Sequence, residues 1–275
     1  MIAASLLAGS GASAAEFSAD VVETRGGFNR SALLWVKGTD TLLAYQANGL
    51  PVIQISRPSS RTYRIVESIP RIVRIVPPEY AEMRGGDLLA TDQPCKASPG
   101  TTCTLTGGED VDGVVAELYQ TGPEGGPGLA RIWWDASRRM ALRIEFNDGR
   151  AMRSIRHGDT TYEALSVETW EQQYLISGQQ VGEGQVLFAP DLGVAVLERR
   201  PDGSERRLVN ITTEAVDDSL FEVPEEYREV PFAQFAPPAS EVPQAEAGAP
   251  AGGSPAEAQP QFQPPNASAP PPPAQ

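Results

Sequence analysis

Short stretches in which apolar and polar residues alternate, or in which β-branched residues cluster, recur over most of the first 215 positions. Successive side chains of a β-strand point to opposite faces, so a period of two is typical of strands with one buried face. Residues that favour turns separate these stretches. The pattern predicts strands over residues 33–36, 41–47, 52–56, 62–67, 72–76, 114–119, 130–135, 140–146 and 152–157.

Tight-turn sequences lie between several of these stretches, at residues 37–40, 48–49, 147–150 and 201–204. Their Gly, Asn and Asp residues tolerate the positive φ of hairpin turns, so we expect successive strands to pair antiparallel. The hairpin around 147–150 should bring together Ile144, Phe146, Met152 and Ile155. The hairpin around 201–204 should bring together Val194, Val196, Leu197, Leu208 and Ile211.

Helical patterns are sparse along the chain. Residues 77–83 could form a short helical turn, and residues 161–174 could be helix or strand. Because no strand and helix alternate regularly, the expected fold class is mainly antiparallel β with minor helix. So few helices leave one apolar face of the sheet in need of a cover or a ligand.

The two ends of the chain differ from its middle. Residues 1–15 are small, apolar and uncharged, and Ala12-Ser13-Ala14 has the small-x-small pattern of a signal-peptide cleavage site. No Lys or Arg precedes Arg25, so we expect translation to start upstream and this segment to be the remnant of a signal peptide. Residues 236–275 carry 12 of the 25 prolines and neither Lys nor Arg, which predicts a disordered tail. The β domain is therefore expected over residues 16–235, in a soluble, exported protein.

The charge and the cysteines narrow the function further. A formal net charge of −14, with only two lysines, argues against nucleic acid as a partner. Cys95 and Cys103 are close in sequence, and in an exported protein such a pair is expected to form a disulfide. Two thiols are too few for a zinc site, and the spacing is not that of a CxxC redox motif.

Candidate catalytic groups are few. His157 is the single histidine and lies at the end of a predicted strand, where an exposed structural role is expected. The chain has no GxSxG motif, phosphate-binding glycine loop, EF-hand loop or HExxH motif, so neither a catalytic site nor a metal or cofactor site is expected. Residues 107–110 and 112–115 look like turns. Trp133 and Trp134 should point to opposite faces of a strand, one into the core and the other outward or into a cavity.

Six segments together carry a resemblance to a known family: residues 17–24, 32–58, 108–121, 131–149, 190–211 and 217–230. In this order and spacing the chain resembles the LolA-like superfamily of periplasmic lipoprotein carriers, which includes relatives of unknown function. The resemblance implies a strongly curved antiparallel half-barrel whose concave apolar face is covered by a few short helices. It also implies that Phe221 and Tyr227 pack back onto the sheet.

The resemblance implies a non-enzymatic periplasmic binding protein that holds an acyl chain or an acylated partner in the concave face of the sheet, with a role in outer-membrane biogenesis. The alternative is a protein-interaction or envelope-sensor module that uses the same sheet and is tethered by the tail. The carriers have an arginine in the second or third strand, whereas the matching region of this chain, residues 41–47, has Leu42, Leu43 and Ala44 instead. The resemblance therefore assigns no ligand-binding residue in this chain. We expect a monomer that does not span a membrane.

Overall fold

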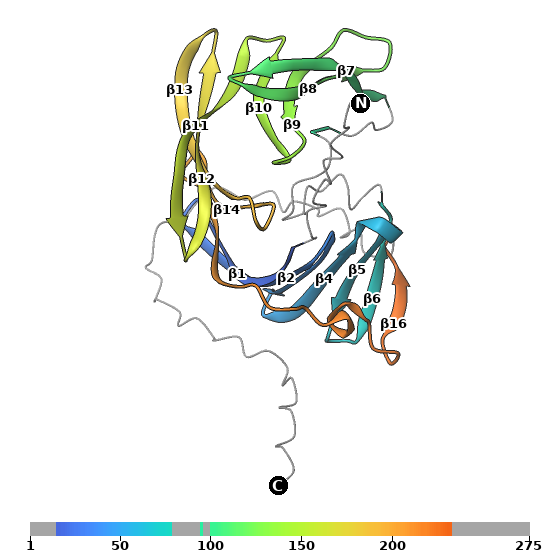
Figure 1. The fold of residues 1–275 in the computed structure, drawn as a ribbon. Helices are drawn as coiled ribbons and strands as arrows, with labels where there is room; N and C mark the ends of the chain where they lie inside the picture. Colours follow the sequence, from blue (N-terminus) through green and yellow to red (C-terminus); the bar gives the residue numbers. More distant parts are fainter. Residues whose placement is uncertain (1–14, 79–93, 96–99, 233–275) are drawn as a thin grey trace, which may run out of the picture. The chain divides into compact units, whose positions relative to one another are not determined.

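The computed structural model describes residues 15–78, 94–95 and 100–232, all within the first of the two units of the chain, Met1–Ala236. These residues form one sheet of sixteen strands and two short 3-10 segments (Figure 1). The strands are β1 Glu16–Arg25, β2 Phe28–Lys37, β3 Asp40–Ala47, β4 Leu50–Arg57, β5 Thr62–Glu67, β6 Ile72–Val76, β7 Thr101–Val111, β8 Val114–Pro123, β9 Ala130–Asp135, β10 Met140–Phe146, β11 Arg150–Tyr162, β12 Leu165–Ile176, β13 Gln179–Ala189, β14 Val194–Arg199, β15 Glu205–Thr212 and β16 Arg228–Pro231. The 3-10 segments are η1 Pro58–Ser60 and η2 Asp218–Phe221.

The strand order is a meander interrupted at two places, where β15 lies beside β1 and β16 lies beside β6. It runs β16-β6-β5-β4-β3-β2-β1-β15-β14-β13-β12-β11-β10-β9-β8-β7. Only β16 pairs in parallel, with β6, and every other described pair is antiparallel. The prediction of a mainly antiparallel β fold is confirmed, and each of the nine predicted strands lies within an observed one.

Helices contribute less than expected. Within the described residues, η1 and η2 are the helical segments longer than one residue, and neither is an α-helix covering the sheet. The expected helical turn at 77–83 lies outside the described residues except for Pro77 and Pro78. Residues 161–174 form the end of β11 and most of β12, because their apolar positions alternate across a sheet. The sheet is open and curved (Figure 1).

Cross-strand pairing defines two faces of the sheet. The outer face carries Leu42, Ile55, Val66 and Val73, which form one buried cluster with Phe221. Phe221 is 0% exposed, and Val223 and Tyr227 pack against the same cluster. Figure 1 shows this segment, in orange, running along the convex side of the first strands. The expected return of the charged C-terminal stretch onto the sheet is therefore confirmed, and its aromatic residues are what bury it.

The inner face carries alternate residues of β1 and β2. Val21 and Leu34 belong to a second buried cluster that includes Leu208 of β15, which pairs with Val21. At this corner the β11–β12 hairpin reaches β15, where the Tyr162 hydroxyl donates a 2.9 Å hydrogen bond to the carbonyl oxygen of Leu208. Cross-strand pairs continue the inner face beyond β15. Arg206 of β15 pairs with Glu198 of β14, Glu198 pairs with Val186 of β13, and Val186 pairs with Trp170 of β12.

Two local expectations need correction. Ile144 pairs with Met152 as predicted, but Ile155 lies on the other face because it is an odd number of residues from Met152. Residues 107–110 are not a turn: they lie within β7, paired to β8, and the turn follows at Asp112 and Gly113.

The expected signal peptide over 1–15 lies outside the described residues except for Ala15, and the tail over 236–275 lies wholly outside them.

Candidate functional site

A groove of about 300 Å³ opens on the inner face beside the β9–β10 turn. Its apolar part consists of Met140, Tyr174, Val186, Phe188 and Ala195, from four strands. Side chains from β12 and β13 meet there because Val186 pairs with Trp170, and Tyr174 and Phe188 lie on the same side at even spacing from these residues. The groove thus has a floor made of the sheet itself.

Polar groups make up the remainder of the groove's lining. They are Arg138, Arg139, Gln172, Glu198 and Arg200. Arg200 is exposed, whereas Glu198 is paired with Arg206 at 2.8 Å. A ligand with an apolar part and a polar head matches this combination better than a wholly polar one, because the apolar floor offers no hydrogen bonds.

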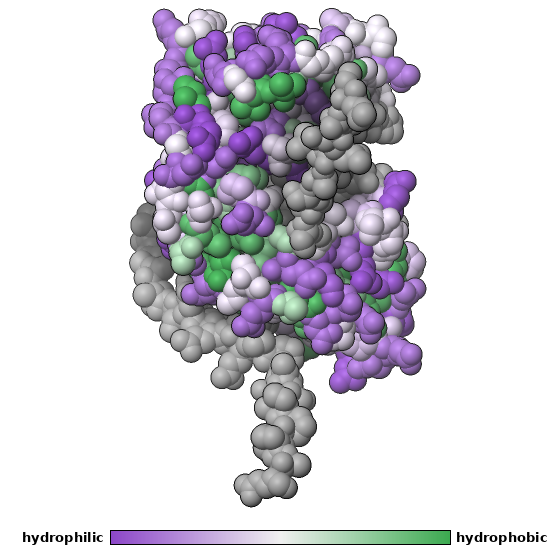
Figure 2. All heavy atoms as spheres, in the orientation of Figure 1, coloured by the Kyte–Doolittle hydropathy of each residue, from purple (hydrophilic) through white to green (hydrophobic). Residues whose placement is uncertain are grey.

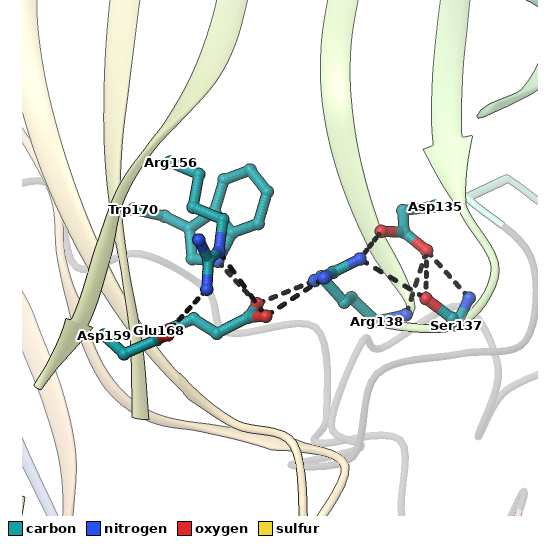
Figure 3. A network of polar contacts seen from close by, with 7 residues as sticks. All are labelled: Asp135, Ser137, Arg138, Arg156, Asp159, Glu168 and Trp170. Carbon is teal, nitrogen blue, oxygen red and sulfur yellow. Dashed lines mark hydrogen bonds and ion pairs between the residues drawn. The ribbon is translucent and has the colours of Figure 1, made fainter. Parts of the chain in front are cut away.

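A polar network fixes the wall of the groove (Figure 3). Arg138 bridges two buried carboxylates: its Nη1 lies 2.6 Å from Asp135 Oδ2, and its Nε lies 2.7 Å from Glu168 Oε2. Its Nη2 also donates to Glu168 Oε1 at 3.0 Å, so the contact with Glu168 is bidentate. Trp170 Nε1 donates to Glu168 as well, at 3.1 Å. The network therefore ties the β9–β10 turn to β12.

The network keeps both carboxylates charged. Hydrogen bonds from Arg138, which outweigh burial, hold the pKa of Glu168 below its ordinary value. Burial raises the pKa of Asp135, but hydrogen bonds from Ser137 and Arg138 outweigh it and lower that pKa overall. Since Arg138 is occupied by these two partners, its part in the groove is structural rather than that of a free cation.

The single histidine lies elsewhere. His157 is within β11, not at the strand's end, and its Nε2 is 2.9 Å from Glu171 Oε2. Both residues line a separate polar cavity of about 260 Å³ together with Thr169 and Gln185. Trp170 also borders this cavity. Thr169, Glu171 and Gln185 alternate with Trp170 and Val186 along β12 and β13, so their side chains lie on the opposite face of the strands that floor the groove. No cluster of metal-binding side chains occurs among residues 15–78, 94–95 and 100–232.

The residues singled out in the sequence have structural roles. Cys95 and Cys103 form a disulfide, with their Cα atoms 5.7 Å apart. Trp133 and Trp134 point to opposite faces as predicted, but both are buried, in separate clusters, and neither is among the groove-lining residues. Trp133 Nε1 donates to Glu109 at 2.8 Å, while Trp134 Nε1 has no hydrogen-bond partner in the described part of the chain.

Sequence reasoning did not find the groove. Its residues come from the β9–β10 turn, β10, β12, β13, β14 and the residue that follows β14, and only the register of these strands brings them together. The Arg138-Arg139-Met140 stretch could have indicated it, because it puts two charges next to an apolar side chain at a turn.

In Figure 2, hydrophobic residues reach the surface in the part of the view where β1 and β14 lie in Figure 1.

The sequence matches no protein-family model and no curated protein. Among solved structures, it is similar to a DUF1329 family protein from Desulfovibrio piger, with 17% identity, a TM-score of 0.33, and coverage of 76% of this chain and 90% of that one. It is also similar to a LolA superfamily protein from Nitrosomonas europaea, with 9% identity, a TM-score of 0.35, and coverage of 76% and 90%.

A third similar structure is a putative outer membrane lipoprotein-sorting protein domain from Vibrio parahaemolyticus, with 10% identity, a TM-score of 0.30, and coverage of 76% and 89%. LolA-superfamily proteins are thus among the structures that the chain resembles, as the sequence indicated. With TM-scores of this size, the likeness assigns neither a family nor a function. In the described part of the chain, no helix has the length and apolar character needed to cross a membrane.

Proposed function

We propose that this protein is a non-enzymatic periplasmic binding protein that holds an acyl chain, of a lipid or of an acylated partner, in the groove on the inner face of its sheet. In this proposal residues 1–15 direct export, residues 16–235 form the binding domain and residues 236–275 are a disordered tail. The observation that carries the proposal is the combination of an apolar floor with a charged rim in one groove.

The size and lining of the groove suit an acyl chain. Ligand sites commonly enclose about 300–1,000 Å³, and the groove, at about 300 Å³, is at the lower end. Each methylene removed from water contributes about 0.8 kcal/mol. A chain that covers Val186, Phe188 and Ala195 would gain this energy, while its polar head could stay in water beside Arg200.

The groove's chemistry supports binding rather than catalysis. Its lining includes neither Ser nor Cys nor His, the side chains most often used as nucleophile or base. Arg138 and Glu198 are held in ion pairs with other residues. Such a lining can position an amphiphile but offers no paired nucleophile and base.

The test is lipid carriage by the natively purified protein. Organic extraction followed by mass spectrometry should recover an acylated molecule at close to one per protein. Ala195→Phe fills the groove and should reduce recovery at least tenfold. The matched control is Gln185→Phe, which adds the same ring to the cavity on the opposite face and should leave recovery unchanged.

Two outcomes would contradict the proposal. A clean extract from wild-type protein, together with no binding of added fatty acid, would remove the acyl chain as ligand and favour the alternative, a protein-interaction module. Equal recovery from Ala195→Phe and from wild type would place any bound lipid outside the groove.

A further inference from the structure

The two edges of the sheet are built differently. β16 is an edge strand of four residues, REVP, with two charged side chains and a proline. Short length, charge and proline are the features by which proteins prevent a sheet edge from pairing with other chains. The β16 edge is therefore closed to further strands.

β7, at the opposite edge, lacks most of these features. It has eleven residues, Thr101–Val111, with neither proline nor Lys nor Arg. Among the described strands β8 is its one neighbour, so the other side of β7 carries backbone groups that pair with no described strand. Residues 104–110 are all exposed. Its one protective feature is the bulge between Leu105 and Gly107.

The disulfide prepares this edge for binding. Cys103 lies in β7 and is bonded to Cys95, so the start of the strand is fixed to a second segment of the chain. A strand that is ordered before it meets a partner loses less conformational entropy on binding. An exposed, preordered edge of this length is the geometry used when an extended peptide is added to a sheet.

We propose that the β7 edge binds an extended segment of a partner protein as an added antiparallel strand, with a basic residue of that segment opposite Asp110. Its backbone groups would supply the affinity and its side chains the specificity. This inference does not depend on the acyl chain, because β7 contributes no residue to the groove.

The side chains on one face of β7 specify the partner's chemistry. Asp110 pairs with Val115, Gly108 with Glu117 and Leu105 with Tyr119, so these three β7 residues share one face. Leu105 is 53% exposed, and Gly108 leaves room for a neighbouring side chain. An antiparallel partner would therefore carry a basic residue and, about four residues later in its sequence, an apolar one.

A second copy of this chain fits the edge less well. Each copy carries a formal charge of −14, and neither Lys nor Arg is present in β7 to meet Glu109 or Asp110. Like charges on two approaching chains disfavour association. The acidic end of β7 therefore selects a basic segment of another protein.

The test uses a fluorescein-labelled, capped nine-residue peptide of Thr and Ser with Lys at its third position and Val at its seventh. The full chain should bind it, and hydrogen exchange at the amides of residues 104–110 should slow in the complex. Replacing the peptide's Lys by Glu should weaken binding at least tenfold. D110N, which removes the charge and retains an oxygen to accept the hydrogen bond from Gly113 N, should weaken binding of the Lys peptide about fivefold.

Two matched variants separate the edge from the neighbouring strand. Leu105→Gln should weaken binding about fivefold, whereas Val115→Gln, an uncharged change at an 81% exposed position of β8 beside Asp110, should bind as wild type. Both should retain acyl-chain binding, which distinguishes this test from that of the groove. Equal binding by the two variants, unchanged exchange at 104–110, or self-association through β7 in sedimentation would each overturn the proposal.

Discussion

Arg138 is predicted to be a main support of the groove's wall. Arg138→Leu removes a side chain that bridges Asp135 and Glu168, whose residues are 3% and 7% exposed. Breaking a buried ion pair by removing one partner costs about 3–5 kcal/mol, because the other charge stays buried. The Arg138 side chain is 25% exposed, so water screens part of this interaction. We expect a loss of about 2–3 kcal/mol in the free energy of unfolding.

The assay is urea unfolding followed by tryptophan fluorescence at pH 7, with the slope of the transition as a check on compactness. The double variant Arg138→Leu/Glu168→Leu should cost less than the sum of the two single variants, because it leaves no unpaired carboxylate at position 168. A loss below about 0.5 kcal/mol for Arg138→Leu, the level of ordinary surface substitutions, would refute this reasoning.

The pH dependence gives a second reading of the same network. The pKa values of Glu168 and Asp135 are lowered from 4.5 and 3.8, so their stabilising effect is present above these values and is lost as the pH falls below them. The stability difference between wild type and Arg138→Leu should therefore shrink from pH 7 to pH 3. A difference that stays constant over this range would contradict the assignment of the shifts to Arg138.

Three further predictions concern other parts of the chain. Phe221→Ala should lower the free energy of unfolding by about 3–5 kcal/mol, because the ring is fully buried. Leu220→Ala, at a neighbouring residue that is 41% exposed, should change it by less than about 0.5 kcal/mol. Equal effects of the two variants in urea unfolding would contradict the packing of η2. Replacing both Cys95 and Cys103 by Ser opens a loop with a sequence separation of 8 and should cost about 2.5 kcal/mol; unchanged thermal unfolding would argue against the bond. Shortening a bound fatty acid by four carbons should weaken its affinity about two hundredfold, at about 0.8 kcal/mol for each methylene. An unchanged dissociation constant would mean that the chain is not buried.

The sequence predicted several of the strands in which one face is buried. Residues 62–67, 72–76, 130–135 and 140–146 coincide with β5, β6, β9 and β10, because hairpin sequences and alternating apolar residues act together there. β7 could not be found in this way, since most of its side chains are exposed on both faces and its Gly and acidic residues look like a turn. Exposure of both faces removes the alternation on which strand prediction depends.

The groove was beyond the reach of the sequence for a different reason. Val186 and Glu198 are neighbours across two strands, and a bulge near Leu187 sets which residues of β14 face the groove. A shift of one residue would turn them to the other face. The covering helices were expected from a family resemblance, not from a periodic pattern in the chain, and the described residues contain none.

The most direct test of the account is photo-crosslinking with a fatty acid that carries a diazirine near the end of its chain, followed by peptide mapping. If the groove holds the acyl chain, crosslinks should fall on Tyr174, Val186, Phe188 and Ala195. Crosslinks that fall instead on Thr169 and Gln185, on the opposite face, would contradict the central claim.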